Sequence, residues 1–182
     1  MILEKNKLGF IQGRLTKQKK KIQQFPFENW KKEFRNAKKL QLTLIEWTID
    51  HYGFYKNPLL NRKYVKLIKY ISKINNIKIN SVTADFFMEK PFWKQKNLSY
   101  YLKKIELLIK FCGIYNIKFI ILPLVDNSSI KTNSAEKTIT HEIKKFNNLL
   151  KELKVNILFE SDYKPKKLFN FIKKFNNQNF GI

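Results

Sequence analysis

Apolar stretches of strand-forming composition alternate along this chain with segments that carry a helical repeat. In 101–112 apolar side chains recur every three or four residues with lysines opposite, which predicts an amphipathic helix. Phe119–Val125 is instead a nearly continuous apolar run, as in strands buried on both faces. The predicted strands are Leu8–Gln12, Leu44–Ile49, Ile79–Ala84, Phe119–Val125, Val155–Glu160 and the short Phe180–Ile182; the predicted helices are Glu28–Leu40, Asn61–Asn75, Leu98–Cys112, Ala135–Leu153 and Pro165–Phe175.

This strict strand–helix alternation predicts an α/β protein with a parallel sheet, either doubly wound or closed into a barrel. Periodicity alone does not choose between the two. No turn after a strand carries a glycine-rich phosphate-binding motif, which weakens a nucleotide-binding doubly wound sheet. Two helix starts have suitable residues: Ser134 as an N-terminal cap and Pro165 in the first turn.

Polar side chains gather just after each of the five longer predicted strands, the edge at which both kinds of α/β protein place their active sites. Five consecutive strands with acidic or amide groups at this edge predict a binding or catalytic site. These residues, in chain order, are Gln12 and Arg14; Glu46, Asp50 and His51; Asp85; Asp126, Asn127 and Ser128; and Glu160 and Asp162.

The composition is that of a globular protein. The 182 residues are 43% hydrophobic and 15% aromatic, with five glycines and five prolines, which predicts a single domain over 1–182 with a sizeable core. Cys112 is the one cysteine, so no intrachain disulfide can form. Met1–Gly9 lacks a signal-peptide core, and the longest apolar run, about seven residues, is too short for a membrane span. We expect a soluble, cytoplasmic protein without a membrane partner.

The net charge of +23 suggests nucleic-acid binding at first sight. Only Arg14, Arg35 and Arg62 are arginines among 37 basic residues, whereas phosphate and base recognition favours arginine. The lysines are spread along helix faces beside abundant Asn, Ile and Phe, a pattern that a biased genome also produces. We expect only non-specific affinity for polyanions.

Several ordered stretches resemble the xylose isomerase-like TIM-barrel family, which includes sugar and sugar-phosphate isomerases and epimerases and the DNA-repair enzyme endonuclease IV. The similarity extends over essentially the whole chain. The stretches are Gly9-Phe-Ile-Gln-Gly-Arg-Leu15, Gln24-Phe-Pro26 with Trp30, Ile45-Glu-Trp47, Asn57-Pro-Leu-Leu60, Ser81-Val-Thr-Ala-Asp-Phe-Phe-Met88, Pro123-Leu-Val-Asp-Asn-Ser-Ser129 and Phe159-Glu-Ser-Asp162.

The resemblance implies an incomplete (β/α)₈ barrel of five βα units and the start of a sixth strand, truncated before the barrel closes. In such enzymes a divalent cation (Mn²⁺, Mg²⁺ or Co²⁺) is held by a Glu at the end of the fifth strand and by later Asp, His and Glu residues. Glu160 matches the first of these and is the expected metal ligand and proton-transfer base. The later ligands have no counterpart here. An open barrel also leaves unpaired edges that favour self-association or a complementing chain.

The remaining candidates each have a structural alternative. Gln12 is expected to bind substrate; Glu46 and Asp85 bind substrate hydroxyls or form buried ion pairs; Arg14 binds an anionic substrate group or pairs with one of those carboxylates. The alternative for Glu160 is an ion pair with a lysine at the strand end.

The loops leave similar choices. Asp126 and Asp162 are expected to contact substrate, although the stretch from Asp126 also suits a turn. His51 suits proton transfer or is incidental, and His141 is expected on a solvated helix surface. The aromatic residues between 86 and 93 form either a sugar-stacking wall or loop core; they are Phe86, Phe87, Phe92 and Trp93.

The function expected from the resemblance is metal-assisted sugar or sugar-phosphate isomerisation or epimerisation through an enediolate. One alternative is an endonuclease IV-like repair protein: the net charge favours it, but that family binds zinc through several histidines, and this chain has only two, in unsuitable places. The other alternative is a non-catalytic or split-barrel remnant.

Overall fold

Six parallel strands form one sheet in the order in which they occur in the chain, β1-β2-β3-β4-β5-β6. The computed structural model describes residues 8–17 and 24–182, so most of the Met1–Gly9 segment lies outside it. The strands are β1 Gly9–Ile11, β2 Leu44–Thr48, β3 Lys78–Thr83, β4 Phe119–Leu124, β5 Asn156–Ser161 and β6 Phe180–Gly181. The α-helices are α1 Trp30–Lys39, α2 Val65–Asn75, α3 Asp85–Glu89, α4 Leu98–Tyr115, α5 Asn133–Lys144, α6 Asn147–Leu153 and α7 Pro165–Lys173.

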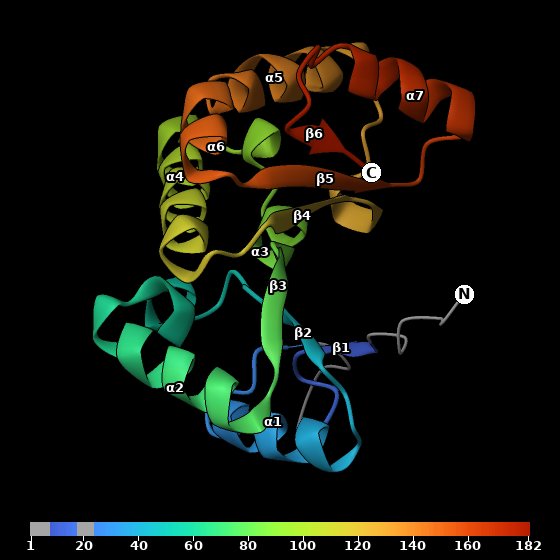
Figure 1. Ribbon diagram of the computed structural model, residues 1–182. Coiled ribbons are helices and arrows are strands. Elements are labelled where there is room, and N and C mark those ends of the chain that lie inside the picture. The colour runs from blue at the N-terminus through green and yellow to red at the C-terminus, as the bar shows by residue number, and fades with distance from the viewer. Residues whose placement is uncertain (1–7, 18–23) are drawn as a thin grey trace.

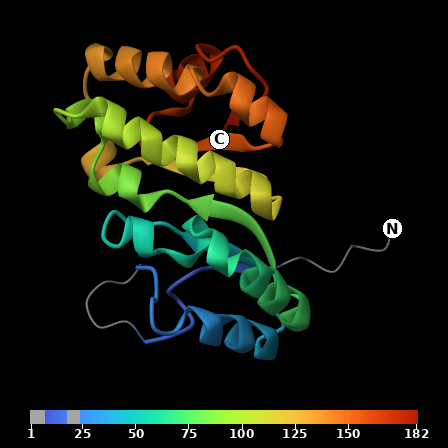
Figure 2. The same cartoon turned by 90° about the vertical axis from the view of Figure 1, so that its left-hand side faces the viewer.

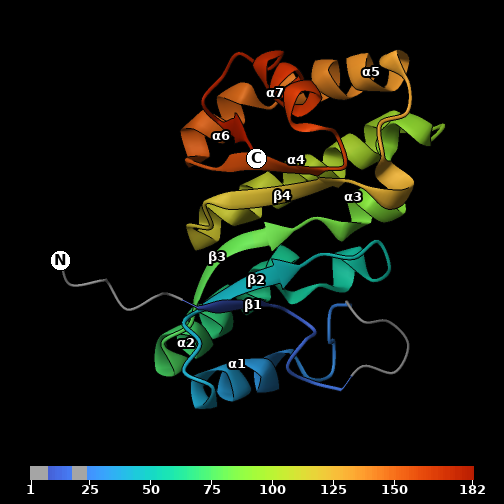
Figure 3. The same cartoon turned by 90° about the vertical axis from the view of Figure 1, so that its right-hand side faces the viewer.

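The strand order decides between the two predicted architectures. A doubly wound sheet reverses its strand order at a switch point, whereas here each strand pairs with the next one in the chain. The helices consequently lie along one side of a curved sheet, as Figure 1 shows. Figure 2 looks onto this helical layer, and Figure 3 shows the strands from the other side. This is the winding of a TIM barrel.

The main core lies between the helices and the sheet. Trp47 of β2 packs against Trp30 and Phe34 of α1, with ring centroids 5.7 and 6.3 Å apart. Phe159 of β5 packs in the same way against Phe171 of α7. Alternate strand residues such as Ile45, Trp47 and Phe159 are therefore buried beneath helices.

Element boundaries differ from the sequence prediction in places that have local causes. The predicted helix Ala135–Leu153 is two helices, because the N–H groups of Lys145 and Phe146 bond three residues back and tighten the chain into a turn. Thr132, not Ser134, caps α5, with its hydroxyl accepting the Ala135 N–H at 3.1 Å. The short α3 and five 3₁₀ segments were not predicted: η1 Phe54–Lys56, η2 Pro58–Leu60, η3 Arg62–Tyr64, η4 Phe92–Lys94 and η5 Asp126–Ser128.

Among the described residues, no helix combines the length and the apolar character needed to cross a membrane.

Candidate functional site

The face of the sheet opposite the helices, here called the concave face, brings together side chains from separate βα units. In β2, Ile45 and Trp47 are buried against helices, and Glu46 between them is half-buried on the concave face. The register pairs Glu46 with Ser81 of β3. In β5, Glu160 follows the buried Phe159 and is exposed. Because side chains alternate along a strand, Glu46 and Glu160 lie on the open side of the sheet.

Electrostatics couples three of the predicted site residues. Burial raises the pKa of Glu46, and the negative charges of Asp85 and Glu160 raise it further. A hydrogen bond from Ser81 Oγ at 2.7 Å acts in the opposite direction without reversing the shift. The structure thus brings Asp85 and Glu160 close enough to Glu46 for their charges to affect its pKa.

Asp85 is the first residue of α3, directly after β3. Its side chain is buried and accepts a hydrogen bond from Thr83 Oγ1 at 2.7 Å. A carboxylate in the first turn of a helix is also favoured by the peptide dipoles. Asp85 is therefore held in a defined position at the carboxyl end of the sheet.

Gln12 follows β1 and is fully buried. Its backbone N–H donates to the Glu46 carbonyl at 2.9 Å, and its Oε1 accepts the Thr48 N–H at 3.3 Å. Its Nε2 is buried and has no hydrogen-bond partner among the described residues. Buried amide groups nearly always have partners, so this N–H donor is unusual for a purely structural residue.

The loop after β1 is held by Glu33 of α1, which the sequence reading did not single out. Glu33 Oε2 accepts the Gly13 N–H at 2.8 Å, and Oε1 accepts the Leu15 N–H at 3.0 Å and the Thr16 hydroxyl at 3.1 Å. Burial raises the pKa of Glu33 although these bonds oppose the shift. Arg14 is exposed in this turn. The available signal was a carboxylate on the apolar face of a helix, between Trp30 and Ala37.

The loop after β2 is fixed by two further residues whose roles were missed. Asp50 accepts the Phe25 N–H at 2.7 Å. Asn57 accepts the indole N–H of Trp47 at 2.9 Å and donates to the Thr48 carbonyl at 3.0 Å. The amide thus ties the start of η2 to β2.

Asp126 and Asp162 lie exposed in the loops after β4 and β5. The segment from Asp126 is a 3₁₀ turn, in which Ser128 Oγ donates to the Pro123 carbonyl at 2.6 Å and accepts the Val125 N–H. Ser129 Oγ donates to Asp162 Oδ2 at 2.6 Å, which joins the two loops. The turn interpretation of this stretch is confirmed; substrate contact stays a prediction.

The aromatic residues after β3 are mainly core. Phe86, Phe87 and Phe92 are each 1% exposed, and Phe87 packs edge-on against Phe92 with centroids 5.3 Å apart. Trp93 is only partly buried. The loop-core interpretation therefore holds for the three phenylalanines.

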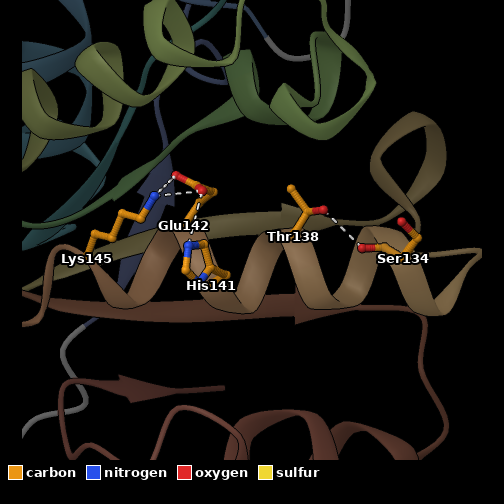
Figure 4. A network of polar contacts seen from close by, with 5 residues as sticks. All are labelled: Ser134, Thr138, His141, Glu142 and Lys145. Carbon is orange, nitrogen blue, oxygen red and sulfur yellow. Dashed lines mark hydrogen bonds and ion pairs between the residues drawn. The ribbon is translucent and has the colours of Figure 1, made fainter.

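The two histidines lie in different settings. His51 is stacked on Tyr101, and its pKa is lowered by burial and by the nearby charge of Lys104. Lys104 is itself buried among aromatic rings, 4.6 Å from the centroid of Phe54. His141 lies on the outer surface of α5, where its ring is 3.7 Å from the Glu142 carboxylate (Figure 4). The expected surface position of His141 is confirmed.

A search of protein-family models and a search of curated proteins find no match to the sequence. Solved structures do match the fold. A xylose isomerase-like TIM barrel protein from Mycobacterium smegmatis in complex with magnesium has a TM-score of 0.66 and 11% identity over 85% of this chain. The 3-keto-D-glucoside 4-epimerase of E. coli gives 0.65 and 13% over 96%. A family 2 AP endonuclease from Brucella melitensis gives 0.59 and 11% over 83%.

This chain has a xylose isomerase-like TIM-barrel fold. It spans 55%, 67% and 60% of the lengths of those three structures, respectively. At these sequence identities the similarity shows the fold alone. Six strands of the xylose isomerase-like barrel are present in the described residues.

The described part of this xylose isomerase-like barrel does not fit a divalent metal ion. Within residues 8–17 and 24–182, no group of three His, Cys, Asp or Glu side chains is arranged to hold one. Catalytic sites for zinc and similar ions generally use three protein ligands. Glu160 by itself therefore provides one oxygen-donor side chain and not a metal site.

Proposed function

We propose that this chain forms the substrate-facing part of a sugar or sugar-phosphate isomerase or epimerase. The observation that carries the proposal is the convergence of Glu46, Asp85 and Glu160, in which burial and then the charges of the two other carboxylates raise the pKa of Glu46. Pairs of acidic groups whose environments differ are suited to move a proton from one atom of a substrate to another.

Each carboxyl group takes one role. Glu160, exposed on the concave face, removes the proton from the carbon beside the substrate carbonyl. Glu46, whose surroundings favour its protonated form, gives its proton to the carbonyl oxygen, so that an enediol forms without a build-up of charge. Glu160 then returns its proton to the neighbouring carbon while the second hydroxyl of the enediol gives its proton to Glu46, which yields the isomer and restores both carboxyl groups. The epimer forms when solvent water protonates the original carbon from the opposite face, the enediol hydroxyl returns its proton to Glu46, and Glu160 gives its proton to the solvent.

The other predicted residues are assigned to substrate binding. Gln12 is assigned to the floor of the substrate site, where its buried Nε2 has no partner among the described residues, and Asp85 provides an acceptor. Arg14 is assigned to an anionic substrate group. Asp126 and Asp162 border the same end of the sheet from the loops after β4 and β5. Because the described residues do not fit a metal ion, no step of this mechanism uses one.

Proton exchange tests the proposal without knowledge of the product. The chain is incubated with D-fructose and with D-fructose 6-phosphate in D₂O, and loss of the C–H signals beside the carbonyl is followed by NMR. We expect exchange that Glu160→Gln and Glu46→Gln each reduce by about tenfold or more, corresponding to at least about 1.4 kcal/mol of barrier. Glu152→Gln on the exposed surface of α6 is the matched control. Equal exchange in all variants would refute the assignment.

We further propose that the edges of the sheet take part in association. Strands β1 and β6 each pair on one side only among the described strands, and open edges are sites of strand pairing. Self-association or a complementing chain would cover them. Light scattering after size-exclusion chromatography tests this, since a monodisperse monomer at micromolar concentration would argue against self-association. A cytoplasmic location stays a prediction.

A second candidate is DNA binding, which the net charge of +23 favours. Titration of an abasic duplex and an intact duplex over a range of salt concentrations distinguishes the candidates. Equal and strongly salt-dependent binding to both would reflect charge alone. Selective binding and cleavage of the abasic duplex would replace the isomerase proposal.

A further inference from the structure

A cavity lies at the opposite end of the sheet from the carboxylates. It opens beside the amino-terminal ends of β2 and β3, between α2 and the last turn of α4, and has a volume of about 710 Å³. Figure 2 shows α2 and α4 side by side in the helical layer. This volume is within the range of small-molecule sites in proteins.

The charge of the cavity wall has one sign. Lys69 and Lys73 of α2 and Lys78 of β3 line it, and none of its lining residues is Asp or Glu. The carboxyl-terminal ends of α2 and α4 adjoin the cavity. A carbonyl group near each end accepts a backbone hydrogen bond, from Ile77 N–H to the Ser72 carbonyl in α2 and from Ile117 N–H to the Cys112 carbonyl in α4. The lysines therefore face a wall that supplies no formal negative charge to neutralise them.

Two irregularities of the wall also indicate a site. The register between β2 and β3 shifts so that Asn80 is an extra residue, and this bulge lines the cavity. Bulges occur preferentially beside functional sites, where they redirect a side chain. Tyr115, at the end of α4, also lines the cavity, and its buried hydroxyl has no hydrogen-bond partner among the described residues.

The inner part of the wall is apolar. Three buried isoleucines form part of the lining: Ile68 of α2, Ile77 just before β3, and Ile79 of β3. A ligand that fits both parts has an anionic head for the lysines and an apolar body for the isoleucines.

We propose that the cavity between α2, β3 and α4 binds an organic anion in which a phosphate or carboxylate group is joined to an apolar body. The proposal is independent of the isomerase assignment, because the cavity shares no residue with the concave-face carboxylates. The lysines bind the head group, and the isoleucines exclude water from the body.

Phenyl phosphate is titrated into the protein, and binding is followed by calorimetry and by amide NMR. Inorganic phosphate, phenol and benzoate are titrated in separate experiments. We expect phenyl phosphate to bind more tightly than phosphate or phenol, with shifts concentrated at residues 76–80 and 115–116. Benzoate shows whether a carboxylate head is accepted in place of phosphate. The double variant Lys69→Gln/Lys73→Gln should weaken binding by about tenfold or more.

The matched control is Lys66→Gln/Lys103→Gln, which removes the same charge from exposed positions of α2 and α4 outside the cavity lining. We expect it to change binding less than twofold. Equal weakening by both double variants would mean that the anion senses only net charge, and would overturn the proposal. Shifts centred on the concave face, abolished by Glu160→Gln, would also overturn it and would assign the probe to the proposed catalytic site.

Discussion

Replacement of Glu33 by alanine tests how the loop that carries Gln12 and Arg14 is held. Glu33 is 0% exposed, and its carboxylate accepts hydrogen bonds from that loop at 2.8, 3.0 and 3.1 Å. The buried Gly13 N–H left without an acceptor costs about 1–3 kcal/mol, and the two partly buried bonds about 0.5–1.5 kcal/mol each. Relief of the carboxylate's own burial, which raises its pKa, offsets part of this loss.

We therefore expect Glu33→Ala to lower the free energy of unfolding by about 3 kcal/mol. For a chain of this length that corresponds to a fall in Tm of roughly 6–12 °C. Urea unfolding followed by tryptophan fluorescence measures the free energy, and circular dichroism measures Tm. Glu33→Gln keeps one accepting oxygen and should lose only about 1–2 kcal/mol.

Glu152→Ala on the exposed surface of α6 is the control and should stay within about 0.5 kcal/mol of wild type. The reasoning is wrong if Glu33→Ala is as stable as this control, since the loop would then not depend on the carboxylate. An Ala variant and a Gln variant of equal stability would show that the accepting oxygen retained by glutamine does not stabilise the loop.

Three further predictions concern the site and its supporting loop. Because the pKa of Glu46 is raised in the folded state, protonated Glu46 stabilises the fold below about pH 4.5, and this contribution is lost as the pH rises through the folded-state pKa. Urea unfolding should therefore show that Glu46→Gln is more stable than wild type at pH 7 but not at pH 4. Gly13 has φ +93°, and an added Cβ would lie 2.3 Å from the Gln24 carbonyl oxygen, so Gly13→Ala should cost at least about 2 kcal/mol in the same assay. Millimolar Mn²⁺ should shift the Tm of wild type and of Glu160→Gln equally, because the described residues offer no three-ligand metal site; a larger shift in wild type would contradict this.

The element types follow from local sequence because their signals are local. The apolar run of β4 and the one-sided apolar repeat of α4 are both visible in short windows of sequence. The expected burial of β4 on both faces is only partial, because Ile120 and Leu122 are buried beneath the helices whereas Phe119 and Ile121 are half-buried on the concave face. Short 3₁₀ segments such as Pro58–Leu60 were missed because their bonds span only three residues and leave no periodic pattern. The break before α6 was missed for a similar reason, since no glycine or proline marks it.

The candidate site could be predicted only as a set of strand ends. Glu46, Asp85 and Glu160 were each visible as polar residues at or near the end of a strand, and parallel strands bring such ends to one edge. Their mutual effect on the pKa of Glu46 depends on distances through space and was not predictable. The same holds for the loop-holding hydrogen bonds of Glu33 and Asn57, which join residues nine to twenty positions apart.

The sequence by itself determined the alternation of strands and helices, the polar carboxyl edge and the resemblance on which the expected chemistry rests. The tertiary structure decided that the sheet winds in one direction, that three carboxyl groups share its concave end, and that a lysine-lined cavity opens at the other end. The physical reason is the range of the interactions. Hydrophobic periodicity reports burial within one element, whereas electrostatic coupling and cavities depend on how separate elements are placed in space.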